Sequence, residues 1–254
     1  MPIPARIVQT HRHESLAQAS RDSWMAHHPD FEYCFYDDAA SRNLIATHCP
    51  ALLATYDRLP LPVQKADMCR YAAIYVHGGI YTDTDTRCCA SFDSYASRKQ
   101  DALVVGVEMS AGSYSKMDDY IGAYPVPHQI LQWTFAANPG HPALAIALKR
   151  IAWFVSLMTD AQLADWSRSM RFTIHLTAGI NFTNVCNEFL SGTREGTVRV
   201  LPRLTWGSWP FEQQRPELAA QIKVQHLYEG SWKADKDRLP QFRKGAEKST
   251  SATP

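Results

Sequence analysis

The chain has 254 residues, with 26 Lys and Arg against 25 Asp and Glu, and its formal net charge is +1. Apolar residues make up 45% of it and charged residues 20%, a globular composition that excludes disordered, collagen-like and coiled-coil chains. The near-neutral charge argues against a nucleic acid as the main partner. We expect one domain over residues 1–243 and a disordered tail, rich in Ser, Thr, Ala and Lys, over residues 244–254.

No stretch of the sequence predicts a membrane span or a cysteine metal site. The most apolar segment, residues 143–158, is interrupted by Lys149 and Arg150, and the N-terminus lacks the apolar core of a signal peptide. The six cysteines include no Cys-x-x-Cys pair, which favours reduced thiols in a reducing compartment. We therefore expect a cytoplasmic protein, with the Golgi lumen as the alternative if an anchor precedes this chain.

Strand and helix signals alternate along the chain, which is typical of an α/β layered domain. Prolines and acidic N-caps mark several helix starts, and a Gly-Gly pair ends the longest helix of the first half. The predicted strands are Ile3–Thr10, Phe31–Tyr36, Ile80–Thr82, Leu103–Val107, Val198–Leu201 and Ile222–Leu227. The predicted helices are Ser15–His28, one from the Asp37-Asp38 cap to about Thr47, a short one after Pro50, Val63–Val76 and Pro142–Met158.

The segment that follows the helix Val63–Val76 carries the clearest chemical signal. Gly78 and Gly79 allow a sharp turn, and a short apolar strand then ends in Asp83 and Asp85. Ligands of open α/β sheets bind outside the carboxyl ends of strands, and residues two apart on a strand share a face. Two carboxylates in this position could converge on one cation, and oxygen ligands suit Mg²⁺ or Mn²⁺.

Two residues of the preceding helix add to this signal. Asp67 and Arg70 are three residues apart and therefore share a helix face, where a carboxylate and a guanidinium could together bind the vicinal hydroxyls of a sugar. The same pair could instead be a structural ion pair. An Asp-x-Asp triplet alone is weak, since a second one, Asp235-Lys236-Asp237, lies in a polar stretch that we interpret as solvated charge.

Together these residues resemble the sugar-binding region of glycosyltransferase family 32. That family includes fungal initiating α-1,6-mannosyltransferases, inositolphosphoceramide mannosyltransferases and bacterial capsular enzymes. The central match comprises Gln64, Ala66-Asp67, Arg70-Tyr71 and Gly78-Gly79-Ile80-Tyr81-x-Asp83-x-Asp85. Weaker matches lie at Ile3–Thr10, at Trp24 with His28–Tyr33, at Thr177–Thr183, and at His226 with Gly230-Ser231-Trp232.

The resemblance implies a GT-A-like single domain with a mixed central sheet flanked by helices. It implies a retaining transfer of a hexose, with mannose or galactose favoured, from a GDP- or UDP-linked donor to a glycan or glycolipid acceptor. Mn²⁺ or Mg²⁺ would be the cofactor, and a lipid-linked acceptor would bring peripheral membrane association.

The resemblance also assigns roles to individual residues. Asp85 would bind the metal directly, with Asp83 and His226 completing the metal site. Asp67, Arg70, Asp83 and Asp85 form the implied catalytic set. The implied donor-binding residues are Thr10 beside the base, Tyr81 packed on the nucleotide, Asp67, Arg70 and Asp83 at the sugar, Gly79, and Ser231 and Trp232 over the diphosphate.

The sequence departs from the family pattern at two places. Val8 and His11 alter the segment that would border the base, and Ala178-Gly179-Ile180 alters the segment that would form a wall for the acceptor. No covalent nucleophile stands out. Our hypothesis is that the acceptor hydroxyl attacks from the front face while its proton passes to the departing phosphate oxygen.

Two other functions remain open at this point. Asp83-Thr84-Asp85-Thr86 also fits the Asp-x-Asp-x-Thr motif of haloacid-dehalogenase-like phosphatases, although those carry the motif on their first strand. A non-catalytic carbohydrate- or nucleotide-binding module on the same fold is the other alternative. Several single residues also have a purely structural interpretation: His226, Trp206, Trp209 and Trp232 as core or surface anchors, Asp118-Asp119 as loop, and His11, His13, His27 and His28 as surface. Glu108, after the strand Leu103–Val107, could line the acceptor cleft or be rim or surface, and we favour rim or surface.

Overall fold

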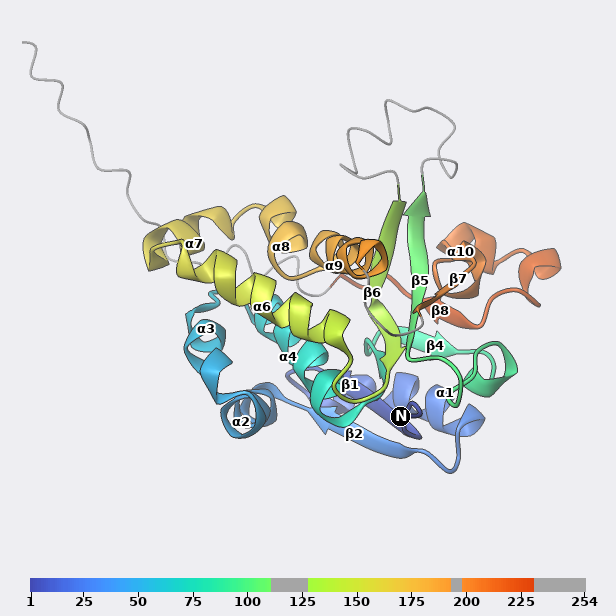
Figure 1. Ribbon diagram of the computed structural model, residues 1–254. Helices are drawn as coiled ribbons and strands as arrows, with labels where there is room; N and C mark the ends of the chain where they lie inside the picture. Colours follow the sequence, from blue (N-terminus) through green and yellow to red (C-terminus); the bar gives the residue numbers. More distant parts are fainter. Residues whose placement is uncertain (111–127, 193–197, 231–254) are drawn as a thin grey trace, which may run out of the picture.

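The computed structural model describes residues 1–110, 128–192 and 198–230, and a six-stranded mixed sheet forms their centre (Figure 1). The strand order is β2-β1-β3-β6-β5-β7. In this sheet β6 runs opposite to the other five strands, because it is antiparallel to both of its neighbours. The strands are β1 (Arg6–Thr10), β2 (Glu32–Tyr36), β3 (Gly79–Thr82), β5 (Leu103–Ser110), β6 (His128–Ala137) and β7 (Val198–Leu201).

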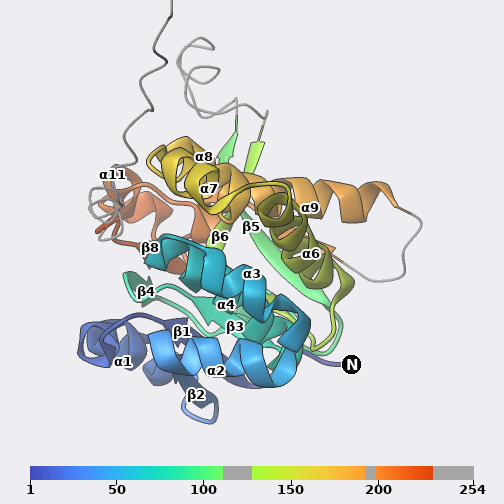
Figure 2. The same ribbon diagram turned by 90° about the vertical axis from the view of Figure 1, so that its left-hand side faces the viewer.

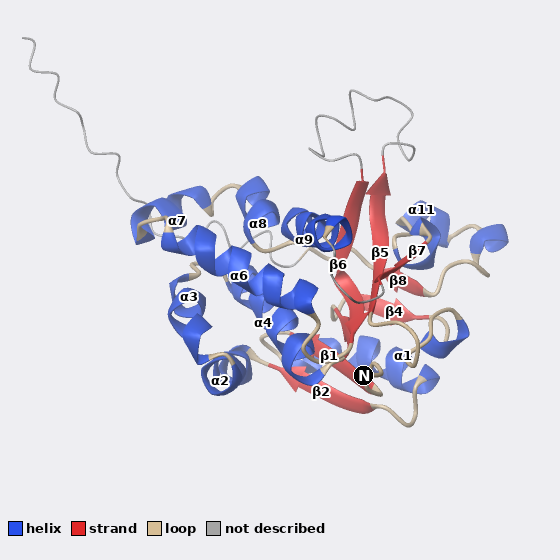
Figure 3. Ribbon diagram, in the orientation of Figure 1, coloured by secondary structure: helices blue, strands red, loops and turns tan. Residues whose placement is uncertain are grey.

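Helices cover both faces of this sheet, so the predicted α/β class with a mixed central sheet is confirmed (Figure 3). One face carries the larger helical layer, which Figure 2 shows from its outer side. This layer contains α2 (Asp38–His48), α3 (Leu53–Arg58), α4 (Pro62–His77), α6 (Pro142–Ser156), α7 (Asp160–Trp166), α8 (Met170–Leu176) and α9 (Gly179–Ser191). The other face carries α1 (Gln18–His27), α10 (Arg203–Trp206), the short α11 (Pro210–Gln213), and a two-stranded sheet of β4 (Thr86–Cys88) and β8 (Val224–His226).

Side-chain alternation along the central strands divides the apolar core in two. On β1 and β3, Val8 and Tyr81 point into the cluster beneath α4, α6 and α9, whereas Ile7 and Ile80 point into the cluster on the opposite face. This is the expected consequence of the two-residue repeat of a strand. Because both faces are covered, β3 is buried throughout its length and its end is held in a fixed position.

The turn from α4 into β3 depends on the two glycines that the sequence singles out. Gly78 has φ +66° and Gly79 has φ +116°, values that L side chains rarely adopt. A Cβ on Gly78 would lie 2.7 Å from the rings of both Pro4 and Pro139, and a Cβ on Gly79 would lie 2.8 Å from the Arg6 carbonyl oxygen. The glycines therefore let the chain turn sharply after α4, so that β3 begins beside β1.

Most predicted elements exist, with shifted ends. The strand predicted at Ile3–Thr10 begins at Arg6, and the one predicted at Ile222–Leu227 is only Val224–His226. Asp37 caps α2 by accepting a hydrogen bond from the Ala40 N–H at 2.7 Å, as predicted. Strands β4 and β6 and helices α7 to α9 have no counterpart in the prediction. Asp118-Asp119, Asp235-Lys236-Asp237 and the 244–254 tail lie outside the described residues.

Among the described residues, no single helix is long and apolar enough to cross a membrane. One pair, α6 with α7, reaches the required length and composition together but is bent by 114°.

Candidate active site

A cavity of about 590 Å³ opens at the edge of the sheet where β1, β2, β3 and β5 end. Because these strands run the same way, their C-terminal residues collect at this edge, as in other open α/β sheets. Thr10 and Tyr36 follow from β1 and β2, Asp83 follows β3, and Glu108 lies near the end of β5; all line the cavity.

The two predicted carboxylates meet a histidine from the distal part of the chain. Single ligand atoms of Asp83, Asp85 and His226 all lie within 4.8 Å of one another. Strand β8 pairs with β4 so that His226 lies opposite Thr86, the residue after Asp85. This pairing places His226 Nε2 3.2 Å from Asp85 Oδ1, and the Glu229 N–H donates to Asp85 Oδ2 at 3.2 Å.

The three groups have perturbed protonation equilibria. Burial raises the pKa of Asp83 to about 6, against the opposing effect of the Arg70 charge. Burial also acts to raise the pKa of Asp85, but the hydrogen bond and charge of His226, together with the backbone N–H of Glu229, outweigh it and the net shift is downward. Burial acts to lower the pKa of His226, but its hydrogen bond to Asp85 and the nearby carboxylates together outweigh it and the net shift is upward. Asp85 is therefore the carboxylate held charged, whereas burial raises the pKa of Asp83 even though Arg70 lies beside it.

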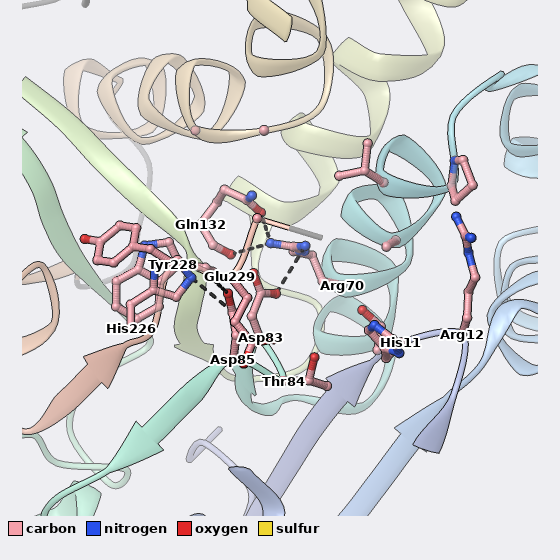
Figure 4. A pocket seen from close by; sticks show the side chains of 18 of the residues that line it. His11, Arg12, Arg70, Asp83, Thr84, Asp85, Gln132, His226, Tyr228 and Glu229 are labelled. Carbon is pink, nitrogen blue, oxygen red and sulfur yellow. Dashed lines mark hydrogen bonds and ion pairs between the residues drawn. The ribbon is translucent and has the colours of Figure 1, made fainter. Parts of the chain in front are cut away.

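Arg70 connects this carboxylate cluster to α4. Its guanidinium lies 3.2 Å from Asp83 Oδ1 (Figure 4). It also lies 3.1 Å from Asp67 Oδ1 and stacks 4.7 Å above the Tyr81 ring. It also donates to the Gln132 backbone oxygen at 3.2 Å and to the Gln132 side-chain oxygen. These contacts hold one fixed cation against Asp83 at the cavity wall.

Buried hydroxyls support the loop that carries Asp83. Thr86 Oγ1 donates to the Asp83 backbone oxygen at 2.7 Å and lies 2.8 Å from Thr82 Oγ1. The Trp24 indole N–H donates to the same Thr86 oxygen at 3.1 Å, and Ser20 Oγ lies 3.2 Å from it. This network fixes the turn after β3 and hence the direction of both carboxylates.

The predicted residues fall into several groups. Thr10, Arg70, Asp83, Asp85 and His226 line the cavity together. Asp67 and Tyr81 are fully buried behind them, where Asp67 contacts Arg70 and Thr177, and Tyr81 donates to Asp83 Oδ1 at 2.5 Å. Gly79 lies at the opposite end of β3 from Asp83. Ser231 and Trp232 lie outside the described residues.

The structure gives the surroundings of three of these residues, and their implied roles at the donor stay predictions. Asp67 is fully buried, lies against Arg70 and does not line the cavity. Tyr81 packs under Arg70 and beside Thr10, at 3.0 Å between hydroxyl oxygens, so it supports the site from within the core. Gly79 serves the chain reversal before β3, as its contact with Arg6 shows.

The sequence analysis missed several cavity residues. Glu108, interpreted as rim or surface, is half-buried in the wall, and His11, interpreted as surface, lines the cavity with Arg12. No local sequence pattern predicts the pairing of β3 with β6. This pairing places the polar side chains of β6 in the cavity wall. The cavity residues that had no assigned role beforehand include Arg12, Gln129, Gln132, Trp133 and Tyr228.

The donor set of Asp83, Asp85 and His226 fits a hard divalent cation. Two carboxylates and one imidazole suit Mn²⁺, and the remaining coordination positions would face the cavity. One ligand atom of each residue lies within 4.8 Å of the others, and a cation would favour the charged form of Asp83, whose pKa burial raises despite the neighbouring Arg70. The residues present therefore fit the metal that the family resemblance implies.

The sheet, the strand-end carboxylates and the buried Asp–Arg pair define the class of the fold as GT-A. The glycosyltransferase domain of the YGT toxin has a similar fold in its ligand-free form, with a TM-score of 0.53 at 8% identity over 78% of this chain and 80% of that one. A UDP-bound structure of the same domain gives a TM-score of 0.51, again at 8% identity, over 78% of this chain and 79% of that one.

Residues 15–102 match the family described as "Glycosyltransferase sugar-binding region containing DXD motif". The chain is 28% identical over 241 residues to the initiation-specific alpha-1,6-mannosyltransferase of Schizosaccharomyces pombe, covering 84% of this chain and 59% of that protein. It is 36% identical over 94 residues to inositol phosphoceramide mannosyltransferase 3 of the same organism, covering 36% of this chain and 26% of that protein. These matches support the resemblance to glycosyltransferase family 32, and the chain spans about three fifths of the first relative and about a quarter of the second.

Proposed function

We propose that this protein is a metal-dependent, retaining glycosyltransferase that moves a hexose from a nucleotide-sugar donor to a glycan or glycolipid hydroxyl. The observation that carries the proposal is the convergence of Asp83, Asp85 and His226 in one cavity beside a buried Arg70. The names of the relatives favour mannose as the sugar. Galactose stays second, from the family resemblance alone. The UDP-bound toxin domain supports a nucleoside diphosphate in the donor, GDP- or UDP-linked.

The geometry separates the tasks of the residues. Asp83, Asp85 and His226 would hold Mn²⁺ or Mg²⁺, which would neutralise the charge that grows on the diphosphate as the glycosidic bond breaks. Arg70 presents a fixed guanidinium to the sugar beside Asp83, and Asp67 holds that guanidinium in place from behind. Thr10, His11 and Arg12 line the part of the cavity at the end of β1, where the nucleotide would bind.

This arrangement supports front-face attack. The acceptor oxygen would bond to the anomeric carbon as the bond to the diphosphate oxygen breaks, and the hydroxyl proton would pass to that departing oxygen. Such a path needs charge stabilisation at the leaving group more than a strong base, and the site provides ligands for a cation and one fixed guanidinium.

The direct test is nucleotide-sugar binding and turnover with Mn²⁺. We expect GDP-mannose or UDP-galactose to raise the melting temperature only when Mn²⁺ is present, because a ligand of the folded state stabilises it. Asp85→Ala should lower nucleoside diphosphate release at least about 100-fold, the scale of losing a major charge-stabilising group. Asp57→Ala, which removes a surface partner of Arg42, is the matched control.

Three outcomes would count against the proposal. Near-normal turnover of Asp85→Ala with Mn²⁺ would mean that the metal site is misassigned. Donor binding with neither sugar transfer nor slow donor hydrolysis would indicate the non-catalytic binding module. Phosphatase activity without nucleotide-sugar binding would indicate the phosphatase alternative, although Asp83 follows the third strand here and not the first. The cytoplasmic location stays a prediction that fractionation of cells can test.

A further inference from the structure

A second polar cluster lines the cavity beside His226, and the proposed donor and metal contacts leave it without a role. It consists of Glu108 on β5, Gln129 and Trp133 on β6, and Gly179 at the start of α9, and we call it the Glu108 cluster. Strand β5 runs in the same direction as β3, so its end brings Glu108 to the same sheet edge as Asp83.

Two buried polar atoms of the Glu108 cluster lack a hydrogen-bond partner. The Gln129 side-chain amide donates to Glu108 Oε2, but its own oxygen, on a residue only 6% exposed, has no partner among residues 1–110, 128–192 and 198–230. The Trp133 indole N–H, 4% exposed, makes no hydrogen bond within the same ranges, although it lies near Glu108, whose pKa burial raises against the effect of this N–H. Unsatisfied buried groups on a cavity wall indicate a ligand that completes them.

The position of the cluster relative to the metal-ligand candidates narrows what this ligand could be. Trp133 stacks on His226, with ring centroids 4.5 Å apart and an interplanar angle of 11°. Figure 4 shows His226 on one side of Asp83 and Asp85, with His11 and Arg12 on the other. The Glu108 cluster therefore adjoins the metal-ligand candidates on the side away from the end of β1, where the nucleotide would bind.

The chemistry of the cluster suits a sugar. Each sugar hydroxyl both donates and accepts a hydrogen bond, and the cluster offers a carboxylate and an amide oxygen as acceptors with an indole N–H as donor. Gly179 leaves space for this arrangement, because a Cβ there would lie 2.8 Å from Gln129 Nε2. Gly179 also belongs to the Ala178-Gly179-Ile180 segment that the sequence analysis associates with the acceptor.

We propose that the Glu108 cluster binds the acceptor, with Glu108 accepting a hydrogen bond from a hydroxyl of an acceptor hexose. This inference rests on the proposed function, since it assigns the acceptor side of the same cavity. It makes Glu108 a specificity-determining residue that contacts the acceptor, while Asp83, Asp85 and His226 would hold the metal and the nucleotide would bind toward the end of β1.

The test uses Glu108→Gln, which keeps the size of the side chain and removes its charge. The probes are methyl α-mannopyranoside and its 2-, 3-, 4- and 6-deoxy derivatives, with nucleoside diphosphate release from GDP-mannose or UDP-galactose as the measurement. We expect kcat/KM for the acceptor to fall about 10-fold or more, the loss of a charge-assisted hydrogen bond, while the Kd for the donor with Mn²⁺ stays constant. With the wild type, one deoxy derivative should have a kcat/KM lower than that of the parent sugar by the same factor. With Glu108→Gln, the same derivative and the parent sugar should have equal kcat/KM.

Two further variants complete the experiment. Glu188→Gln is the matched control, because this exposed carboxylate on α9 pairs only loosely with Arg150, at 3.4 Å. Gly179→Ala displaces the Gln129 amide without removing a charge, so it should raise the acceptor KM, and it serves as the test if Glu108→Gln does not fold.

The possible failures are distinguishable. Three results would overturn the acceptor assignment alone. One is an unchanged kcat/KM for the acceptor in Glu108→Gln, and another is an equal loss of kcat/KM with each deoxy derivative in wild type and variant. The third is weaker donor binding, measured as a higher Kd, in Glu108→Gln. A wild-type protein that binds no nucleotide sugar and releases no nucleoside diphosphate would overturn the proposed function and this inference with it.

Discussion

Arg70→Met tests whether the positive charge of Arg70, and not only the volume of its side chain, stabilises the folded site. In the wild type, the guanidinium lies 3.1 Å from Asp67 and 3.2 Å from Asp83, and the Asp67 side chain has no exposed surface. Removing one partner of a buried pair leaves an uncompensated charge and costs about 3–5 kcal/mol. At about 2–4 °C per kcal/mol for a protein of this size, the melting temperature should fall by roughly 6–20 °C.

The assay is urea unfolding of the wild type, Arg70→Met, Asp67→Asn and the double variant. The double variant should lose at least about 2 kcal/mol less unfolding free energy than the sum of the two single variants. It removes the Asp67 charge together with the Arg70 charge, so no unpaired charge stays buried. Burial raises the pKa of Asp67, so this carboxyl takes up a proton more readily in the folded state and the cost of Arg70→Met should shrink as pH falls. Additivity of the two single variants within about 0.5 kcal/mol would refute the reasoning.

Three further predictions follow from the same contacts. Because the pKa of Asp83 is about 6, lowering the pH from 7 to 5 protonates a candidate ligand, so calorimetry should show weaker Mn²⁺ binding with proton release; a pH-independent affinity would contradict this. Thr177→Val removes the 2.6 Å hydrogen bond to Asp67 and should lower the unfolding free energy by about 1.5–3 kcal/mol in urea titrations, whereas an unchanged midpoint would mean that the bond is not needed. In thermal melts Gly78→Ala should destabilise the protein more than Gly140→Ala. Both glycines have positive φ, for which Gly140→Ala should cost about 1–2 kcal/mol, but only at Gly78 would a Cβ also clash with neighbouring atoms. Equal losses in the two variants would contradict the packing argument.

The parts of the fold that the sequence predicted are those with local signals. The helix at Val63–Val76 and the strand at Ile80–Thr82 are confirmed with small shifts, because a proline, two glycines and an apolar run specify their ends. Strand β6 was missed because it lies in the middle of the sheet, covered on both faces, and so carries no polar–apolar alternation.

The candidate site divides in the same way. The Asp83 and Asp85 pair follows from a local motif, whereas the choice between core and ligand for His226 depended on the pairing of β8 with β4, which no local pattern specifies. Glu108 was interpreted as rim or surface, with the acceptor cleft as the alternative, because its surroundings depend on β6, which pairs with β5, and on α9, which packs against β6. Burial likewise decides that Asp67 and Tyr81 act from behind Arg70.

The β4–β8 pairing also bears on how the protein matures during synthesis. Glu229, whose N–H holds Asp85, comes 144 residues after it, and His226 lies on the same late strand. A nascent chain halted before Val224 would already possess every strand of the six-stranded sheet and both carboxylates, but not the imidazole that completes the trio. On the proposed function, binding of the ion is therefore expected to require residues 224–229, and translation products that stop before Val224 should be inactive even where they fold.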